Sequence, residues 1–252
     1  MSDTAPRTLI VTGGSRGIGA AIARAAGRAG FRVALSYKGD AAGAEAVAGA
    51  IAAAGSEALA VRADVSREED VVALFAAVDT RFGPPDVLVN NAGGVGPLGR
   101  VEALTAATLA EVMAVNVIGS FLCCREAVRR MTTRYGGRGG VIVNMSSRAA
   151  ELGGAGEWVH YAASKGAVDS LTIGPAREVA TEGIRVNAVA PGLIATELHA
   201  RAGAPDRLER LAPAIPMQRP GTAEEVADIV MWLASPASAY VTGAIVPVAG
   251  GR

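Results

Sequence analysis

The segment Thr8–Gly19, Thr-Leu-Ile-Val-Thr-Gly-Gly-Ser-Arg-Gly-Ile-Gly, joins a short apolar run to a glycine-rich turn. The apolar run predicts a strand covered on both faces, and the Ala-rich stretch that follows predicts a helix. Glycines between a strand and a helix let the backbone approach a pyrophosphate, which then binds at the positive end of the helix. The segment therefore predicts a dinucleotide site whose binding residues are Gly13, Ser15, Arg16, Gly17, Ile18 and Gly19.

The glycines of this turn follow the spacing Gly-x-x-x-Gly-x-Gly, which differs from the general dinucleotide fingerprint Gly-x-Gly-x-x-Gly. The turn does not end in Lys-Ser or Lys-Thr, so it is not the phosphate-binding loop of a nucleotide hydrolase. A structural connection is the alternative interpretation. The position of the turn, between the first strand and the first helix, favours nucleotide binding.

Further short apolar runs alternate with longer Ala-rich stretches along the rest of the chain. The predicted strands are Thr8–Thr12, Arg32–Tyr37, Ala58–Arg62, Val87–Asn90, Val141–Met145, Arg185–Ala190 and Ala244–Val248. The predicted helices lie near 17–29, 40–54, 67–82, 106–133, 158–182 and 223–234. This alternation is typical of an α/β fold with a parallel, doubly wound sheet and helices on both faces. No composition break divides the chain, so we predict a single domain over residues 1–252.

The region 193–220 has weak periodicity and contains four prolines, Pro205, Pro213, Pro216 and Pro220. It follows a predicted strand, and open α/β sheets bind their ligands beyond the carboxyl ends of the strands. We therefore expect this region to form a substrate lid.

The composition excludes several classes of protein. The chain has 252 residues, and its 24 Lys and Arg residues balance its 24 Asp and Glu residues, whereas a nucleic-acid-binding protein is expected to carry a basic excess. The N-terminus lacks the apolar core of a signal peptide, and no run approaches the ~18 apolar residues of a membrane span. Cys123 and Cys124 are adjacent and lack metal or redox spacing, which favours buried packing. These features predict a soluble cytoplasmic protein with no metal site, no nucleic-acid partner and no membrane partner.

The charges near the second predicted strand bear on the choice of cofactor. A site selective for NAD usually places an acid at this strand end, but here the strand ends in Tyr37 and is followed by Lys38. Arg16 adds a second cation. Two cations favour a 2′-phosphate and hence NADP(H) over NAD(H), with ordinary solvated charge as the alternative. Asp40 is interpreted as a helix N-cap, and Asp64 either accepts a bond from the adenine amino group or caps the helix near residue 67.

Tyr161 and Lys165 are the first candidates for catalysis. The chain contains only two lysines, Lys38 and Lys165, beside 22 arginines. A spacing of four residues places Tyr161 and Lys165 on one face of a helix. A compact ammonium can lie beside a phenol and a sugar hydroxyl where a planar guanidinium would not fit equivalently. An ammonium in this position is expected to lower the pKa of the phenol and so to activate it as a proton exchanger.

Five motifs together resemble the short-chain dehydrogenase/reductase family over essentially the whole chain. In order they are the glycine turn, Asn90-Asn91-Ala92-Gly93, Ser146-Ser147, Tyr161-Ala-Ala-Ser-Lys165 and Pro191-Gly192. The resemblance implies a Rossmann-type sheet of seven strands and a homotetramer. It also implies that Tyr161 is the catalytic acid/base, Lys165 its partner and Ser147 the residue that binds the substrate oxygen. Asn116 matches the asparagine that completes the tetrad through a helix irregularity and a water.

One spacing departs from the family pattern. Ser147 lies 14 residues before Tyr161, one more than the common spacing, and the Gly-rich stretch Gly153–Gly156 can absorb the extra residue. Ser146 is the alternative for the same role. The cofactor-binding residues that the resemblance and the strand ends indicate beyond the glycine turn are Tyr37, Lys38, Asp64, Val65, Asn90, Asn91, Ala92, Gly93, Tyr161, Lys165, Pro191, Gly192, Ile194 and Thr196.

The predicted function is NADP(H)-dependent interconversion of a ketone and a secondary alcohol. The substrate is either a 3-oxoacyl thioester or a sugar or polyol, because Gly156–Tyr161 is similar to segments of sugar dehydrogenases in the family. Arg125, Arg129 and Arg130 could bind an acyl-carrier protein, or they form an ordinary solvated face. A non-catalytic dinucleotide-binding module is the alternative from another class. His199, Glu157, Trp158 and Arg148 are expected near the pocket with no assigned role, and His160 is not expected to face Tyr161.

Overall fold

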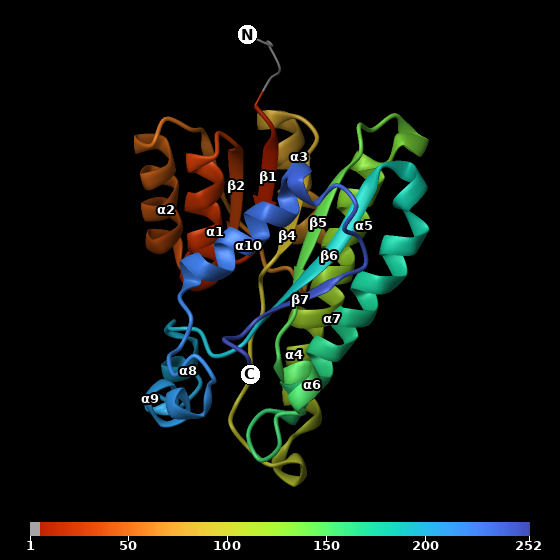
Figure 1. Ribbon diagram of the computed structural model, residues 1–252. Helices are drawn as coiled ribbons and strands as arrows, with labels where there is room; N and C mark the ends of the chain where they lie inside the picture. The colour runs from red at the N-terminus through yellow and green to blue at the C-terminus, as the bar shows by residue number, and fades with distance from the viewer. Residues whose placement is uncertain (1–5) are drawn as a thin grey trace.

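The computed structural model describes residues 6–252 and contains one sheet of seven parallel strands in the order β3-β2-β1-β4-β5-β6-β7 (Figure 1). The strands are β1 (Thr8–Val11), β2 (Arg32–Tyr37), β3 (Ala58–Arg62), β4 (Val87–Asn90), β5 (Gly140–Met145), β6 (Ile184–Pro191) and β7 (Ile245–Val248). Each predicted strand is present, with bounds that differ by at most one residue. The predicted α/β, doubly wound fold is thus confirmed.

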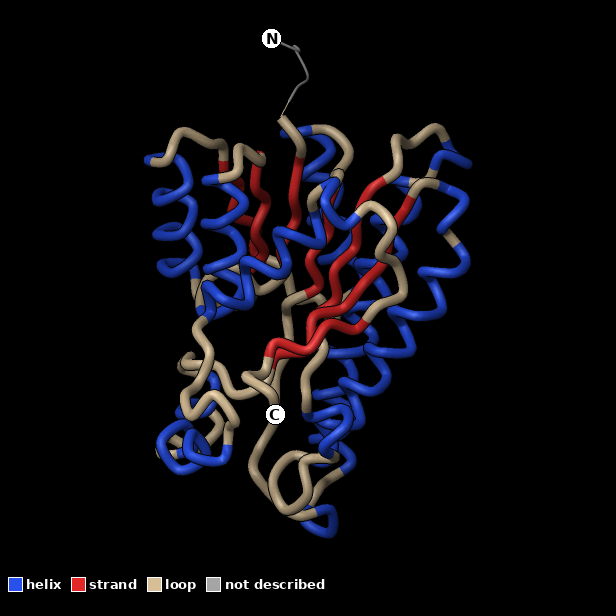
Figure 2. The backbone as a smooth tube through the Cα atoms, in the orientation of Figure 1, coloured by secondary structure: helices blue, strands red, loops and turns tan. Residues whose placement is uncertain are grey.

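The helices cover both faces of this sheet (Figures 1 and 2). They are α1 (Gly17–Arg28), α2 (Ala41–Ala53), α3 (Glu68–Phe82), α4 (Ala106–Met113), α5 (Gly119–Met131), α6 (Ala149–Leu152), α7 (Val159–Glu178), α8 (Leu198–Arg201), α9 (Arg207–Leu211) and α10 (Ala223–Ala234). Successive strand residues point to opposite faces. Leu9 and Val11 therefore pack with α1, α2 and α10, whereas Ile10 packs with α3, α5 and α7. This two-sided burial explains why the strands are apolar throughout.

The predicted helix at 106–133 is not one continuous α-helix. It is interrupted by a π-helical turn, Ala114–Ile118, between α4 and α5. Within this turn the Asn116 side chain bonds both main-chain polar groups of Gly94, and the Asn116 carbonyl accepts a hydrogen bond from Ser120 Oγ at 2.8 Å. The helical repeat of the sequence does not encode these contacts with the loop after β4, so it predicts an uninterrupted helix. The predicted helix at 158–182 is also shorter, because α7 ends at Glu178 and a short 3₁₀ turn follows.

The stretch Ala106–Met131 is long and apolar enough to cross a membrane by length and composition alone. In the fold it forms α4, the π-helical turn and α5 on one face of the sheet, and Cys123, Ala127 and Met131 lie in the hydrophobic core. Cys124 is buried beside them, as expected from the sequence.

The strand order reverses between β1 and β4, because β2 lies on one side of β1 and β4 on the other. Ligands of open α/β sheets bind at this switch point, outside the carboxyl ends of the strands. The residues after β6, including α8 and α9, lie at the same end of the molecule (Figure 1). The fold thus places the expected lid region beside the expected nucleotide site.

Candidate active site

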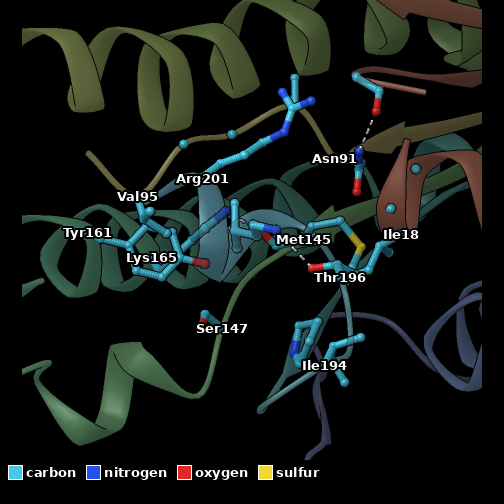
Figure 3. Close-up of a pocket in the computed structure, with 18 of the residues that line it drawn as sticks. Ile18, Asn91, Val95, Met145, Ser147, Tyr161, Lys165, Ile194, Thr196 and Arg201 are labelled. Carbon is cyan, nitrogen blue, oxygen red and sulfur yellow. Dashed lines mark hydrogen bonds between the residues drawn. The ribbon is translucent and has the colours of Figure 1, made fainter. Parts of the chain in front are cut away.

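A cavity of about 710 Å³ opens at the carboxyl ends of the strands. Its walls come from the glycine turn, from the loops after β2 to β6, and from α6, α7, α8 and α9. Figure 3 shows Tyr161, Lys165 and Ser147 at this cavity, with Ile18, Ile194 and Thr196 on another wall. Nearly all the residues expected from the sequence line it, and the exceptions are Asn90 and Asn116.

The glycine turn lies directly against the loop that follows β4. A Cβ atom at Gly19 would be 2.3 Å from the Gly13 carbonyl oxygen and 2.4 Å from Asn91 Nδ2, so this position has room only for glycine. Gly13 itself has φ +65°, which disfavours other residues. Helix α1 then begins at Gly17 without a side-chain cap. Its first N–H groups therefore remain open to an anion, as dinucleotide binding requires.

The loop after β4 is held in place by two asparagines with different surroundings. Asn91 Nδ2 donates to the carbonyl oxygens of Thr12 at 2.9 Å and of Gly13 at 3.0 Å, and Asn91 lines the cavity. Asn90 is buried beneath the loop, where its Nδ2 donates to Asn144 Oδ1 at 2.9 Å. The expected cofactor role of Asn90 is therefore indirect, because its side chain packs into the sheet rather than into the cavity.

The cations expected at the adenosine end are both paired with carboxylates. Lys38 Nζ lies 2.7 Å from Asp64 Oδ2, and Arg16 Nη1 lies 3.7 Å from Asp40 Oδ2. Burial acts to raise the pKa of Asp64, but the hydrogen bonds from Lys38 and Ser66 outweigh it and the pKa lies below its ordinary value.

The two acids in these pairs have different structural roles. Asp40 caps α2 as predicted, since its side chain accepts a hydrogen bond from the Gly43 N–H. Asp64 does not cap α3, whose N-cap is Arg67. Its side chain bonds Ser66 within the preceding turn.

Helix α7 presents Tyr161 and Lys165 one turn apart, as their spacing predicts. Lys165 Nζ lies 5.6 Å from the centre of the Tyr161 ring and donates to the Met145 carbonyl oxygen at 2.6 Å. Lys165 is 5% exposed, and burial lowers the pKa of its ammonium to about 8. The ammonium is therefore poised to lose its proton close to neutral pH.

The pKa of the Tyr161 phenol lies above its ordinary value in this structure, and its activation by Lys165 stays a prediction. Burial raises the pKa of the phenol, and the opposing contribution is a hydrogen bond with Ser147. The Lys165 ammonium bonds to Met145 at the end of β5 rather than to the phenol oxygen. Activation of the phenol by Lys165 thus requires the ammonium to shift toward it.

The structure distinguishes between Ser146 and Ser147. The Ser147 side chain lies at the cavity within hydrogen-bonding range of Tyr161, and Figure 3 shows it below the phenol. Ser146 is only 3% exposed, and its hydroxyl is directed toward the carbonyl oxygen of Lys165 at 3.5 Å. Gly153, Gly154 and Gly156 all have positive φ in the turn after α6, which is the loop where we expect the additional residue before Tyr161.

Asn116 lies behind the cavity wall, in the π-helical turn. Its Nδ2 donates to Gly94 O and to Ser164 Oγ, each at 2.9 Å, and the residue is 1% exposed. A Cβ atom at Gly93 would be 3.2 Å from Asn116 Oδ1 and 3.6 Å from Lys165 Nζ. Asn116 and Lys165 thus flank the same glycine, but no direct hydrogen bond joins them among residues 6–252.

The segment after β6 crosses in front of the glycine turn. Pro191, Gly192, Ile194 and Thr196 all line the cavity. Gly192 N donates to Val248 O at 2.9 Å, and Ile194 pairs with Gly221 as an isolated bridge. The Thr196 methyl group is 3.6 Å from the Cβ position of Gly17, so this segment and the start of α1 enclose one volume.

A charged clamp joins the segment 193–220, which we expected to form a lid, to the start of α7. Arg207 on α9 bonds Glu157 and lies over the Trp158 ring, 4.7 Å from its centre, while Arg210 is 3.4 Å from Glu157. Burial acts to raise the pKa of Glu157, but the two guanidiniums bring it below its ordinary value. His199 also lines the cavity, and burial together with Arg207 lowers its pKa to about 4, so its imidazole is neutral.

The Arg207 contact could not be found from the sequence, because 50 residues separate it from Glu157. The apolar lining residues Val95, Leu152, Leu193 and Leu198 also carry no local signal. Arg148 pairs with Glu151 at 2.5 Å and donates to the Arg252 carbonyl oxygen at 2.8 Å. His160 is buried outside the cavity, as expected.

We expect Arg207→Ala to raise the KM for the predicted carbonyl substrate about tenfold, equivalent to about 1.4 kcal/mol. The substitution removes the clamp between lid and helix and leaves the Glu157 carboxylate with one exposed partner. The KM for the nucleotide should stay unchanged, since the glycine turn is not touched. Steady-state kinetics with each substrate varied in turn provide the measurement. Arg210→Ala is the matched control because it removes only the longer, exposed contact with Glu157, and an equal effect from it would contradict the leading role of Arg207.

The comparisons with known proteins agree with this geometry. Residues 13–252 match a family model described as enoyl-(acyl carrier protein) reductase. The chain belongs to the short-chain dehydrogenase/reductase family.

Among curated relatives of this dehydrogenase/reductase chain, the uncharacterized oxidoreductase YgfF of Escherichia coli is 51% identical over 243 residues, which cover 96% of this chain and 98% of that protein. The 3beta-hydroxysteroid dehydrogenase 1 of Eggerthella lenta is 41% identical, covering 99% of this chain and 94% of that protein. A solved short-chain dehydrogenase/reductase from Serratia marcescens has a TM-score of 0.90 at 37% identity, covering 98% of each chain. The chain is therefore an oxidoreductase of this family.

Relatives with other named activities are less similar. A 3-oxoacyl-[acyl-carrier-protein] reductase of Staphylococcus aureus and glucose 1-dehydrogenase 2 of Bacillus subtilis are each 37% identical. A blue fluorescent protein from a metagenomic library, solved in complex with NADPH, is 33% identical with a TM-score of 0.88.

Proposed function

We propose that the chain is an NADP(H)-dependent reductase that interconverts a ketone and a secondary alcohol. The observation that carries this proposal is that Tyr161, Ser147 and Lys165 share one cavity with the glycine turn. The cavity suits the cofactor on structural grounds, because Gly13 and Gly19 leave no room for a side chain and the start of α1 is uncapped. When bound, the nicotinamide supplies or accepts the hydride at the carbonyl carbon.

The residues of the chain handle the proton that accompanies the hydride. In the reductive direction Tyr161 Oη donates its proton to the carbonyl oxygen as negative charge develops there. The Ser147 hydroxyl donates a hydrogen bond to the same oxygen and orients it. The Lys165 ammonium stabilises the phenolate that is left, and Asn116 holds the backbone around Gly93. In the oxidative direction the phenolate takes the proton back.

The preference for NADP(H) rests on Arg16, within the glycine turn, and on Lys38, directly after β2, both of which line the cavity. The exposed fractions of their side chains are 48% and 70%, so either can turn from its carboxylate partner toward a phosphate. One structural relative was solved in complex with NADPH, which supports the choice of NADP(H) over NAD(H).

The substrate end of the cavity favours an apolar ketone over a sugar. Its lining includes Val95, Leu152, Trp158, Leu193 and Leu198. The nearby Glu157 carboxylate is engaged by two arginines and is not free to bind hydroxyl groups. A polyol would place some of its hydroxyls against these apolar side chains, at a cost of about 1–3 kcal/mol for each hydroxyl left unpaired.

The 3-oxoacyl thioester remains one candidate among such ketones. However, the three arginines that could bind an acyl-carrier protein all form ion pairs with carboxylates. Arg125 pairs with Glu68 at 2.8 Å, Arg129 with Glu126 at 3.0 Å and Arg130 with Asp79 at 2.7 Å. These pairs support the interpretation of an ordinary charged face. We therefore propose that the substrate is a free ketone or a thioester. We also propose that the chain forms a homotetramer in the cytoplasm.

The test is NADPH oxidation against acetoacetyl thioesters, diketones and keto-sugars, with the reverse NADP⁺ reaction on the matching alcohols. We expect kcat/KM for the apolar ketones to exceed that for keto-sugars at least about tenfold, because each unpaired polar group costs about 1–3 kcal/mol. Faster turnover of sugars or polyols would instead support the sugar-dehydrogenase alternative. Nucleotide binding with no turnover of any compound would support the non-catalytic module.

A further inference from the structure

Three buried polar atoms in the wall of the cavity have no hydrogen-bond partner. They are Trp158 Nε1, His199 Nδ1 and Arg207 Nε, and each is covered by protein in this structure. Among the described residues that line the cavity, no other side-chain nitrogen or oxygen is both buried and unpaired. Buried polar groups of folded proteins are nearly always hydrogen-bonded, so three unpaired atoms in one wall call for an explanation.

These atoms come from three elements that meet in one place. Trp158 directly precedes α7, and the Arg207 guanidinium on α9 lies over its ring, 4.7 Å from the centre. The His199 ring on α8 lies 6.5 Å from the Trp158 ring, measured between their centres. The Ala204 N–H donates to the His199 carbonyl oxygen at 2.9 Å, and the Ala204 carbonyl oxygen accepts from the Arg207 N–H at 3.3 Å. We call the three side chains the nitrogen cluster.

The nitrogen cluster lies beside the proposed acid/base. Trp158 forms a small hydrophobic cluster with Val95 and Ala204, and Tyr161 packs against it. Figure 3 shows Val95 next to Tyr161 at the cavity. A ketone whose carbonyl oxygen is bound at Tyr161 therefore has the rest of its carbon chain close to the nitrogen cluster.

The unpaired atoms are suited to a hydrogen-bond acceptor. An indole N–H and an arginine Nε–H can only donate, whereas one nitrogen of a neutral imidazole donates and the other accepts. The charge of Arg207 is already balanced by Glu157, which Arg210 also contacts. A carboxylate bound here would be repelled by Glu157. An uncharged oxygen, such as that of a carbonyl group, therefore suits the nitrogen cluster best.

The oxygen can reach these atoms when α8 and α9 move away from α7. The two helices are short, with four and five residues. From this segment, the hydrophobic cluster around Trp158 contains Ala202 and Ala204, whose small side chains bury little apolar surface. A small displacement therefore costs little, and closure over a ligand oxygen gives the three nitrogens the partner that they lack here.

We propose that Trp158, His199 and Arg207 form a subsite for a second, uncharged acceptor oxygen of the substrate. The inference rests on the proposed function and narrows its substrate to ketones that carry another carbonyl group, such as a diketone or a 3-oxo ester or thioester. A monoketone of the same length leaves the donors unpaired. The subsite is also compatible with the apolar lining around it, because it accommodates one oxygen and not the many hydroxyls of a polyol.

The experiment uses six-carbon ketones that differ in the second oxygen, namely hexan-2-one, hexane-2,3-dione and hexane-2,5-dione, reduced by the full chain with NADPH. Trp158→Phe keeps an aromatic ring and removes the N–H. It should lower kcat/KM for the preferred dione about tenfold more than for hexan-2-one, which corresponds to one lost hydrogen bond. Because the variant is compared with the wild type on each ketone, differences in intrinsic reactivity cancel.

Two further variants separate the subsite from other effects. Arg207→Lys keeps a positive charge beside Glu157 but removes the Nε–H, so it should show a similar selective loss on the dione. Trp232→Phe is the matched control, because the only other tryptophan lies on α10 outside the cavity and is 41% exposed. It should leave the ratio between the two ketones at the wild-type value. If Trp158→Phe does not fold, judged by circular dichroism, Arg207→Lys decides.

Binding is measured separately by calorimetry in the presence of NADP⁺, which cannot reduce a ketone. The wild type should bind the preferred dione about tenfold more tightly than hexan-2-one, and Trp158→Phe should remove most of that preference. Because calorimetry needs no turnover, a wild type that binds the dione selectively but reduces none of these ketones would reject the proposed function alone.

Four results would overturn the inference. The first is equal binding of the dione and hexan-2-one by the wild type, and the second is an equal loss on both ketones in Trp158→Phe. The third is the same selective loss in Trp232→Phe. The fourth is tighter binding of 3-oxobutanoate than of its methyl ester, since that would indicate recognition of a charge instead of a neutral oxygen.

Discussion

Replacing Tyr161 by phenylalanine is expected to lower kcat about 10³-fold, within the range contributed by a positioned general acid. The substitution removes one oxygen from a residue whose ring packs with Val95, Trp158 and Ala204, so the cavity should keep its shape. Affinity for NADPH should remain nearly intact, because the glycine turn and the segment after β6 are unchanged. Stopped assays for kcat and fluorescence titration for NADPH affinity provide the two measurements.

Tyr240→Phe is the matched control for this experiment. Tyr240 is fully exposed and lies outside the cavity, so the loss of its hydroxyl should leave both quantities at their wild-type values. A Tyr161→Phe variant that retains turnover near the wild-type rate would show that the proton comes from another group. The neighbouring Ser147 hydroxyl would then be the first residue to test.

The double substitution Arg16→Ala with Lys38→Ala is expected to raise the KM for NADPH about 100-fold, since a hydrogen bond to a charged group contributes about 1.5 kcal/mol or more. The KM for NADH should be nearly unchanged, because NADH carries no 2′-phosphate for these cations to bind. The ratio of the two KM values, measured with one carbonyl substrate, is the quantity of interest.

The single variants separate the two cations. Lys38 is held by Asp64 at 2.7 Å, whereas Arg16 is only 3.7 Å from Asp40 and is freer to turn. We therefore expect Arg16→Ala to account for more of the effect. Arg28→Ala, at the exposed far end of α1, serves as the control for loss of positive charge. Equal losses for NADH and NADPH in the double variant would reject the 2′-phosphate interpretation.

The fold was predictable from the sequence because its signals are local. A strand buried on both faces must be apolar at nearly every position, and the runs at 32–37, 58–62 and 87–90 match the observed strands residue for residue. The interruption of the helix at 106–131 was expected only from the family resemblance, which implies a helix irregularity at Asn116, and not from the hydrophobic pattern. Its π-helical turn depends on hydrogen bonds between Asn116 and Gly94, and no periodic pattern encodes a contact with a separate loop.

Most of the residues that line the cavity could also be predicted from the sequence. Glycines that must allow close approach of the backbone cannot be replaced, and the observed distances at Gly13 and Gly19 give the reason. For Asp64 the sequence left two roles open. The structure excludes the cap of α3, whose N-cap is Arg67, and Asp64 lines the cavity. The sequence did not show that the cofactor role of Asn90 is indirect, because only packing decides that this side chain at the end of β4 bonds Asn144 instead of entering the cavity.

By itself, then, the amino-acid sequence determined the order of strands and helices, the glycine turn, and the alignment of Tyr161 with Lys165, since each follows from spacing along a single element. The tertiary structure alone decided where charges meet. It directed the Lys165 ammonium onto Met145 O, paired Arg16 and Lys38 with acids, and joined Arg207 to Glu157 across 50 residues. Electrostatic effects depend on distance and burial rather than on separation in the chain, so these pairings become visible only once the chain has folded.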